Sequence, residues 1–330
     1  MDRPMRLRRL ALLLLLPVSA EAACAGRDLR LDMAPETRAE LDAAVGQTVF
    51  PEGNHWIARK GGTVLHLIGT LHLNDPRMGP IVERLAPTLS QADAFYFEIT
   101  QSDMAEFEKN LAADFSPVLI TSGPSLIDLM DEADWARIST ALAARGVPGW
   151  MAAKMQPWFL SMMLGMPPCM LQMPDADHGM DARLSELALS RGIRQHSLER
   201  IEDLIAIFQS HSLEDQVQSL VRMTGALQAG DDQMATMANS YIEEKHAEIL
   251  QLAKILGREA SGLPPEVFAS EWAEFEDQLL VQRNANWMEK ILSIRGQTAV
   301  IAVGAGHLAG DHGLLMQLQN AGYNLTREPF

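Results

Sequence analysis

Cysteine is scarce in this chain: Cys24 and Cys169 are the only two among 330 residues. At most one disulfide can therefore form within the chain. In an oxidising compartment the two cysteines could pair and tie the start of the exported chain to its middle. Equally, Cys24 could lie on a flexible terminus while Cys169 is buried as a small apolar side chain. The sequence leaves both alternatives open.

Long apolar runs are also missing. After residue 22 no stretch approaches the roughly 18 apolar residues that a membrane-spanning helix needs. The first 22 residues combine a basic start, a short apolar core over 10–16 and a small-x-small site at Ala20 and Ala22, which is the pattern of a secretory signal peptide. We therefore expect cleavage near Ala22 and export to the periplasm or the medium, with no membrane span in the mature chain.

Positive charge is in short supply. The chain has 27 Lys and Arg residues against 43 Asp and Glu residues, for a formal net charge of −16. Such a surface repels nucleic acid and anionic lipid headgroups, and no basic patch with interleaved aromatic residues offsets it. Nucleic acid is therefore excluded as a partner.

Several catalytic signatures are absent as well. The sequence has no Gly-x-Ser-x-Gly elbow, no P-loop, no Gly-x-Gly-x-x-Gly and no His-Glu-x-x-His. These patterns are typical of serine hydrolases, nucleotide-binding enzymes and zincins respectively. Their absence argues against these three classes of protein, so that any catalytic activity must rest on other residues.

Two short segments that are present share one plan. The segments are 69–72 and 304–307. Each follows an apolar run and consists of a glycine, two small or apolar residues and a histidine, which is His72 in the first and His307 in the second. The apolar runs predict short buried strands. A glycine at the strand exit lets the chain turn sharply, so that the histidine projects beyond the sheet, where ligand sites of α/β sheets lie.

The remaining pattern predicts a sheet formed by both ends of the chain. A hairpin is expected over 48–73, and the middle of the chain, about 102–292, reads as mostly helical. The fold class is therefore α/β (α+β), with a central mixed sheet and a large helical insertion, in one domain over 23–330. Further strands are expected at 94–99, 298–303 and 323–327, and helices at 79–91, 125–145, 181–191, 198–208, 213–228, 233–256, 265–294 and 313–321.

Glu98 is the third candidate site residue. It ends an apolar strand, on the rim where His72 should emerge, and a carboxylate there would be costly to bury without a partner. Two imidazoles and a carboxylate suit a divalent metal such as Zn, Mn, Co or Fe(II), with a position left open for water. The structural alternative is that His72 and His307 only cap the sheet by hydrogen-bonding loop carbonyls.

Three further residues could support such a site. Asp181 is expected to cap the helix over 181–191, and Glu199 lies at a helix start, where a carboxylate also favours the helix dipole. Arg283 lies on a long amphipathic helix, where it could clamp a substrate carboxylate or pair with Glu98 or Glu199.

These residues resemble the TraB/GumN (TraB/PrgY/GumN) family, which includes the Tiki-type membrane metalloproteases. The resemblance covers about residues 46 to 328, and this chain departs from Tiki in lacking a membrane anchor and in reading Arg200 where threonine is usual. The segments that carry it are 67–72, 97–98, 179–184, 197–199, 283–284, 303–310 and 322–323.

The resemblance implies that His72, Glu98 and His307 are metal-ligand or catalytic positions, with Mn, Co or Zn as the metal. We therefore expect an exported metal-dependent hydrolase, in which metal-activated water cleaves a peptide or related amide. Arg283 would steady the oxyanion or a substrate carboxylate, and Glu199 or Asp181 would orient the histidines. The alternatives are a metal-independent esterase-like hydrolase, with Glu98 or a histidine as general base, and a non-catalytic protein that sequesters a peptide.

Overall fold

The computed structural model describes residues 26–171, 175, 178–224 and 230–330. The predicted signal peptide and Cys24 lie outside these residues, so the export of the chain stays a prediction, and the two alternatives for Cys24 and Cys169 stay open. No helix within the described ranges is long and apolar enough to cross a membrane.

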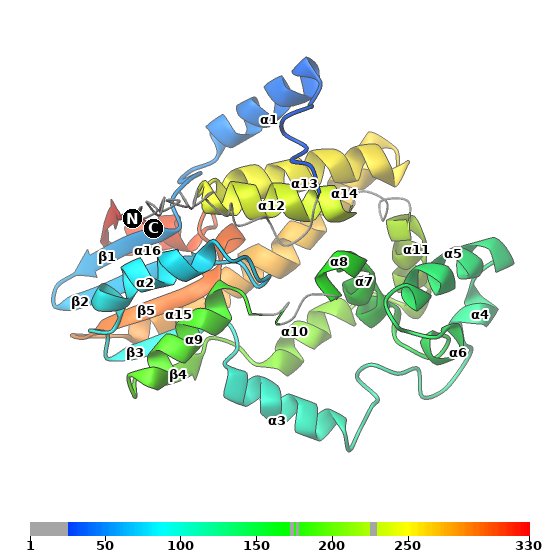
Figure 1. Cartoon of the computed structure of the whole chain (residues 1–330), viewed down its shortest axis with the longest axis horizontal. Helices are drawn as coiled ribbons and strands as arrows, with labels where there is room; N and C mark the ends of the chain where they lie inside the picture. The colour runs from blue at the N-terminus through cyan, green and yellow to red at the C-terminus, as the bar shows by residue number, and fades with distance from the viewer. Residues whose placement is uncertain (1–25, 172–174, 176–177, 225–229) are drawn as a thin grey trace, which may run out of the picture.

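A six-stranded mixed sheet forms one half of the molecule, with the strand order β4-β3-β5-β2-β1-β6 (Figure 1). The four strands from β4 to β2 run parallel, while β1 pairs antiparallel with both β2 and β6. The predicted sheet from both ends of the chain is therefore confirmed. The strands are β1 His55–Lys60, β2 Thr63–Thr70, β3 Ala94–Phe97, β4 Arg194–Ser197, β5 Thr298–Gly304 and β6 Asn324–Arg327.

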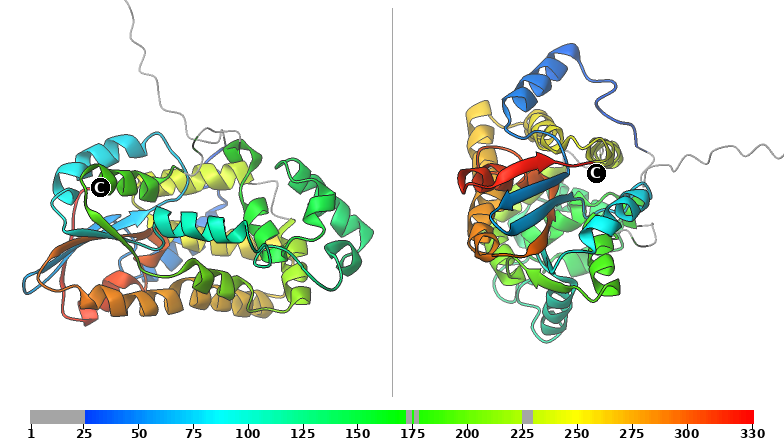
Figure 2. Two further views of the ribbon diagram at one scale, coloured as in Figure 1. Left: turned by 90° about the horizontal axis from the view of Figure 1, so that it is seen from below. Right: turned by 90° about the vertical axis from the view of Figure 1, so that its left-hand side faces the viewer.

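Helices cover both faces of this sheet (Figure 2), and most of the others follow one another in the middle of the chain. The α-helices of the described residues are α1 Pro35–Gln47, α2 Met78–Leu89, α3 Gln101–Leu111, α4 Leu126–Leu129, α5 Glu132–Ala143, α6 Gly149–Ala152, α7 Pro157–Gly165, α8 Pro168–Leu171, α9 Met180–Ser190, α10 Ile201–Phe208, α11 Leu213–Met223, α12 Gly230–Ile242, α13 His246–Ser261, α14 Pro265–Glu276, α15 Gln282–Ser293 and α16 Leu314–Asn320.

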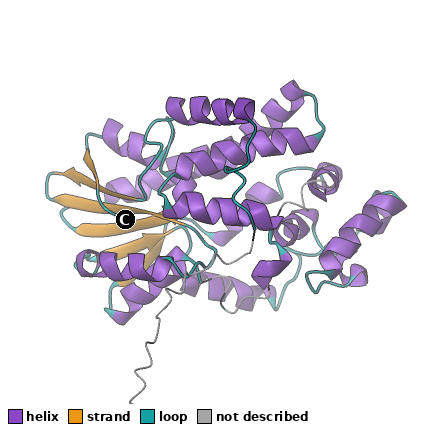
Figure 3. Ribbon diagram, turned by 45° about the horizontal axis from the view of Figure 1, so that its top comes forward, coloured by secondary structure: helices purple, strands orange, loops and turns teal. Residues whose placement is uncertain are grey.

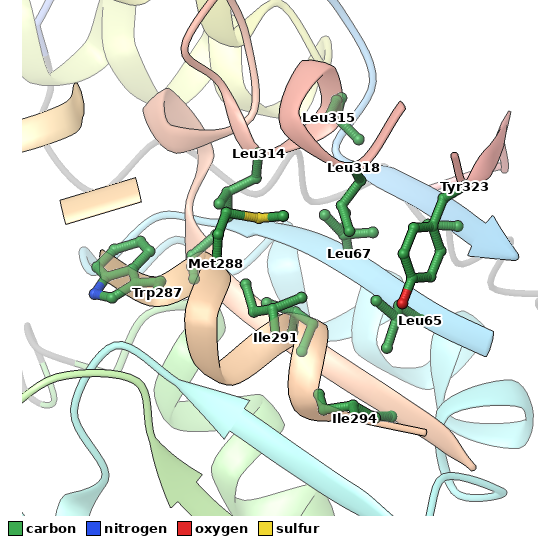
Figure 4. Close-up of a cluster of buried hydrophobic side chains, with 14 of the residues drawn as sticks. Leu65, Leu67, Trp287, Met288, Ile291, Ile294, Leu314, Leu315, Leu318 and Tyr323 are labelled. Atoms are coloured by element: carbon green, nitrogen blue, oxygen red, sulfur yellow. The ribbon is translucent and has the colours of Figure 1, made fainter. Parts of the chain in front are cut away.

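Two hydrophobic layers sandwich the sheet because its central strands are apolar on both faces. On one face, α15 and α16 pack on β2 and β5, and Figure 4 shows Ile291 and Leu318 in one cluster with Leu65 and Leu67. On the other face, α2 and α9 cover β3 and β5, with Tyr241 of α12 beside them. The central strands are thereby held from both sides.

The part of the helical insertion that contains α4 to α8 and α11 extends away from the sheet (Figure 1 and Figure 3). It has a hydrophobic cluster of its own, in which α5, α7 and α11 meet through Ile138, Leu142, Leu160 and Val217. The prediction of a mostly helical middle is confirmed, with one strand that it missed. That strand, β4, joins the sheet edge beside β3.

Some predicted helices are divided in the structure. The helix expected over 125–145 is two, α4 and α5, because Asp131 caps a new helix by accepting from the Asp134 N–H. The helix expected over 233–256 breaks where Glu244 takes a positive φ of 61°. By contrast, α14 and α15 run on through a π-helical turn, η2 Asp277–Val281.

A buried ion-pair network ties the start of the described chain to α12 and α13. Arg30 pairs with Asp28 at 2.6 Å and with Glu248 at 3.1 Å, and all three side chains are only 7% exposed. Asn239 also donates to Asp28, at 3.0 Å. Burial alone would raise the pKa of Asp28, but the hydrogen bonds from Arg30 and Asn239 lower it to about 2.

We expect Asp28→Asn to lower the free energy of unfolding by about 2 kcal/mol at pH 7, because it leaves part of the Arg30 charge uncompensated. The folded-state pKa of Asp28 is depressed, so its contribution is fully present above about pH 4 and is lost as pH falls through about 2. Urea unfolding of both proteins between pH 7 and pH 2.5 should show the difference shrink.

Asp32→Asn is the matched control, since Asp32 pairs with Arg27 at 3.4 Å but is 73% exposed. It should change stability by no more than about 0.5 kcal/mol. A difference for Asp28→Asn that stays constant with pH would contradict this account of the network.

Candidate functional site

The carboxyl ends of β2, β5 and β3 lie side by side, because β5 pairs in parallel with both of the others. His72 follows β2, Glu98 follows β3, and His307 ends the short 3-10 turn after β5. The structure therefore brings the three sequence-predicted residues to one edge of the sheet, the edge at which α/β folds bind ligands.

Glu98 is held in one position at this edge. Its Oε1 accepts the Gly304 N–H at 2.6 Å, and its Oε2 accepts from Arg283 Nη2 at 2.5 Å. Burial alone would raise the pKa of Glu98, but the neighbouring His307 and Arg283 lower it to about 2. Glu98 is therefore an ionised carboxylate, although its side chain is only 15% exposed.

Arg283 joins Glu98 to Glu199. Its Nε lies 3.1 Å from both oxygens of Glu199, and its Nη2 donates to the same carboxylate as well as to Glu98. Its Nη1 donates to the Leu279 carbonyl in η2, at 3.1 Å. Of the alternatives drawn from the sequence, pairing with Glu98 or Glu199 is the one that the structure contains, and Arg283 pairs with both.

His307 is a buried, neutral imidazole. Its Nδ1 lies 2.7 Å from Asn284 Oδ1, and its Nε2 lies 3.3 Å from Arg283 Nη1. A guanidinium can only donate, so Nε2 is the acceptor, and we infer that Nδ1 carries the proton. Burial lowers the pKa of His307 to about 4, and its Nε2 lies 3.8 Å from Glu98 Oε1.

His72 is set differently. Its Nδ1 lies 3.0 Å from Asp181 Oδ1, its side chain is 63% exposed, and contact with Asp181 raises its pKa to about 9. The approach of Asp181 depends on Gly179, because a Cβ there would lie 2.3 Å from the backbone of His72. Gly179 also takes the N-cap position of α9, so the expectation that Asp181 caps this helix is wrong: Asp181 lies in the first turn.

The two remaining sequence candidates have separate partners. Asp181 lies 3.0 Å from His72, and its predicted role in orienting a site histidine stays a prediction. Glu199 orients Arg283 rather than a histidine, and its second oxygen accepts from Trp287 Nε1 at 3.1 Å. Arg283 also lies over the Trp287 ring, 4.8 Å from its centroid.

Sequence reasoning missed the role of Asn284. It binds His307 through Oδ1 and donates from Nδ2 to the carbonyl of His312, at 3.0 Å. Its position next to Arg283 was the available signal, since consecutive buried polar residues on a helix need partners.

In the arrangement described, the predicted ligands do not fit a divalent metal. Within residues 26–171, 175, 178–224 and 230–330, no group of three or more His, Cys, Asp or Glu residues has the geometry to hold an ion. Both Glu98 oxygens already accept hydrogen bonds, and the Arg283 guanidinium faces His307 Nε2. The assignment of His72, Glu98 and His307 as metal ligands therefore stays a prediction.

Comparison with known proteins adds the family. The chain is 25% identical to the uncharacterized protein YbaP of Escherichia coli K12 over 280 residues, which cover 81% of this chain and 94% of that protein. It is equally similar to YbaP of Shigella flexneri. No solved structure matches the chain significantly. The TraB/PrgY/gumN family model matches residues 54–327, and the chain therefore belongs to this family.

Proposed function

We propose that this protein is a hydrolase that cleaves a peptide or a related amide or ester, with water activated by Glu98 and His307. The observation that carries the proposal is the pairing of a buried, ionised carboxylate with a neutral imidazole whose unprotonated Nε2 lies 3.8 Å away. Two proton acceptors at the ligand-binding edge of a sheet are the arrangement that activation of water requires.

In the proposed reaction the water oxygen attacks the substrate carbonyl carbon and its proton passes to the Glu98–His307 pair. The C–N or C–O bond then breaks, and the leaving group takes a proton from His72, which Asp181 holds. Glu98 and His72 are close enough for the charge of His72 to lower the pKa of Glu98. A single edge could thus supply both the base and the acid.

Arg283 has a positioning role in this proposal. Its Nε, Nη1 and Nη2 all donate to groups of the protein, so the guanidinium is committed to Glu98, Glu199, His307 and the Leu279 carbonyl. It keeps the Glu98 carboxylate ionised and fixed at the edge. The role predicted from the sequence, direct contact with an oxyanion or a substrate carboxylate, would require Arg283 to give up one of these bonds.

A metal-dependent hydrolase is the second candidate, and one observation favours it. Both histidines use Nδ1 for a protein partner, Asp181 for His72 and Asn284 for His307. This turns each Nε2 toward a ligand, although Nε2 of His307 would first have to give up its contact with Arg283 Nη1. Metal-binding histidines are commonly oriented in this way. Mn, Co or Zn would require His72, Glu98 and His307 to rearrange around the ion.

We expect Glu98→Gln to lower kcat by at least about 100-fold on any peptide or ester that the wild type cleaves, because the amide cannot accept the proton of water. Glu202→Gln is the control, since Glu202 is 52% exposed and pairs with the exposed Arg200. Turnover on a peptide and ester library measures the effect, and circular dichroism checks the fold. Stoichiometric peptide binding without product, in wild type and variant alike, would instead support a sequestering protein.

The two hydrolase candidates differ in their response to chelation. If the protein residues alone activate water, activity should survive dialysis against EDTA, and elemental mass spectrometry of protein purified without a His tag should find no stoichiometric metal. About one equivalent of Mn, Co or Zn in the wild type, lost in His72→Ala and His307→Ala but kept in His211→Ala, would establish the metal-dependent candidate. His211 is the control because its side chain is 43% exposed and pairs with Glu274 at 3.7 Å, away from the three site residues.

A further inference from the structure

Thr70, the last residue of β2, has a buried hydroxyl without a hydrogen-bond partner among the described residues. The residue is only 2% exposed. Leaving a buried hydroxyl unpaired costs about 1–3 kcal/mol, so such groups are rare and call for a ligand or an ordered water. A threonine at the end of an apolar strand, where valine would pack equally well, therefore points to a bound polar molecule.

The pairing of β2 with β5 places this hydroxyl beside the site. Thr70 is opposite Gly304, whose N–H binds Glu98 Oε1. Side chains alternate along a strand, so Thr70 shares the sheet face of Ile68, which is the face of Ala302 and of position 304. A Cβ at Gly304 would lie 3.2 Å from Glu98 Oε1, and the carboxylate therefore reaches the face that carries Thr70.

The spacing suits one water molecule. Thr70 on β2 lies about 4.8 Å from Gly304 on the neighbouring β5, and Glu98 reaches Gly304 from β3, on the other side of β5. One water beside Gly304 can therefore bridge the hydroxyl and the carboxylate. Among the described residues Glu98 Oε1 accepts one hydrogen bond, from the Gly304 N–H, and the unprotonated Nε2 of His307 at 3.8 Å donates none, so the oxygen has a lone pair to spare for a further donor. The absence of a side chain at Gly304 keeps the space open.

We propose that the Thr70 hydroxyl holds the water molecule that Glu98 activates. The inference rests on the proposed function and names one more residue of its site. The hydroxyl donates to the water oxygen while the carboxylate accepts a water proton, which fixes the direction of the remaining lone pair toward the substrate. Fixing the attacking atom in this way is a large part of what an enzyme contributes to a hydrolysis.

Thr70→Val and Thr70→Ser test the proposal as a pair. Valine has the same shape but no hydroxyl, and the hydroxyl bonds no group of the residues that the structure describes, so the melting temperature should stay the same or rise. We expect kcat to fall about 10- to 100-fold with KM little changed, and serine to retain most of the activity. A Thr70→Val protein that is fully active while Glu98→Gln is inactive would overturn this inference alone.

If Thr70→Val lost activity and its melting temperature also fell, Thr70 would have a structural role, and the proposal that it holds the water would be overturned as well. A crystal structure gives a readout independent of turnover. We expect an ordered water within about 3.2 Å of both Thr70 Oγ1 and the Glu98 carboxylate in the wild type, absent in Thr70→Val. If the wild type hydrolyses nothing, the proposed function fails, and the absence of this water would overturn the Thr70 inference separately.

Discussion

The ion-pair cluster around Arg283 is the constraint on which the rest of the site depends. One guanidinium, 9% exposed, compensates two carboxylates that are almost as buried, Glu98 and Glu199, while it donates to His307. Removing one partner from a buried cluster leaves an uncompensated charge, at a cost of about 3–5 kcal/mol. The ends of β3, β4 and β5 and the helix α15 are therefore fixed relative to one another by electrostatics as well as by packing.

The sheet topology explains why this cluster can form at all. Because β5 inserts between β2 and β3, residues from the first third and the last tenth of the sequence end at adjacent points of one edge. The insertion brings the chain back through β4, which puts Glu199 next to the Glu98 backbone, with a Glu199 N–H to Glu98 carbonyl bond of 3.1 Å. The π-helical turn η2 supplies a further acceptor, the Leu279 carbonyl, to which Arg283 donates.

Local sequence signals predicted the edge at which the site lies and every strand but β4, and named Glu98 and Glu199 as possible partners of Arg283 without deciding between them. The apolar runs before Gly69 and Gly304 were sufficient to place both histidines, because a buried strand followed by glycine is a local pattern. Strand β4 was missed because residues 194–197 are polar and alternately exposed, as an edge strand can be. Arg283 lies 185 residues from Glu98 in sequence, and only tertiary packing decides which of its possible partners it meets.

The two histidines share one sequence plan and have opposite environments. The His72 side chain is exposed and contacts the Asp181 carboxylate, which raises the pKa of His72. The His307 side chain is buried and contacts the Asn284 amide, and burial lowers the pKa of His307. Two structural caps for the same sheet would need no such difference, since either imidazole could bind loop carbonyls in either state. Acid–base catalysis needs it, because one group must give a proton while another takes one at the same pH. The difference between the two environments therefore favours a catalytic role for the two histidines over a purely structural role as caps of the sheet.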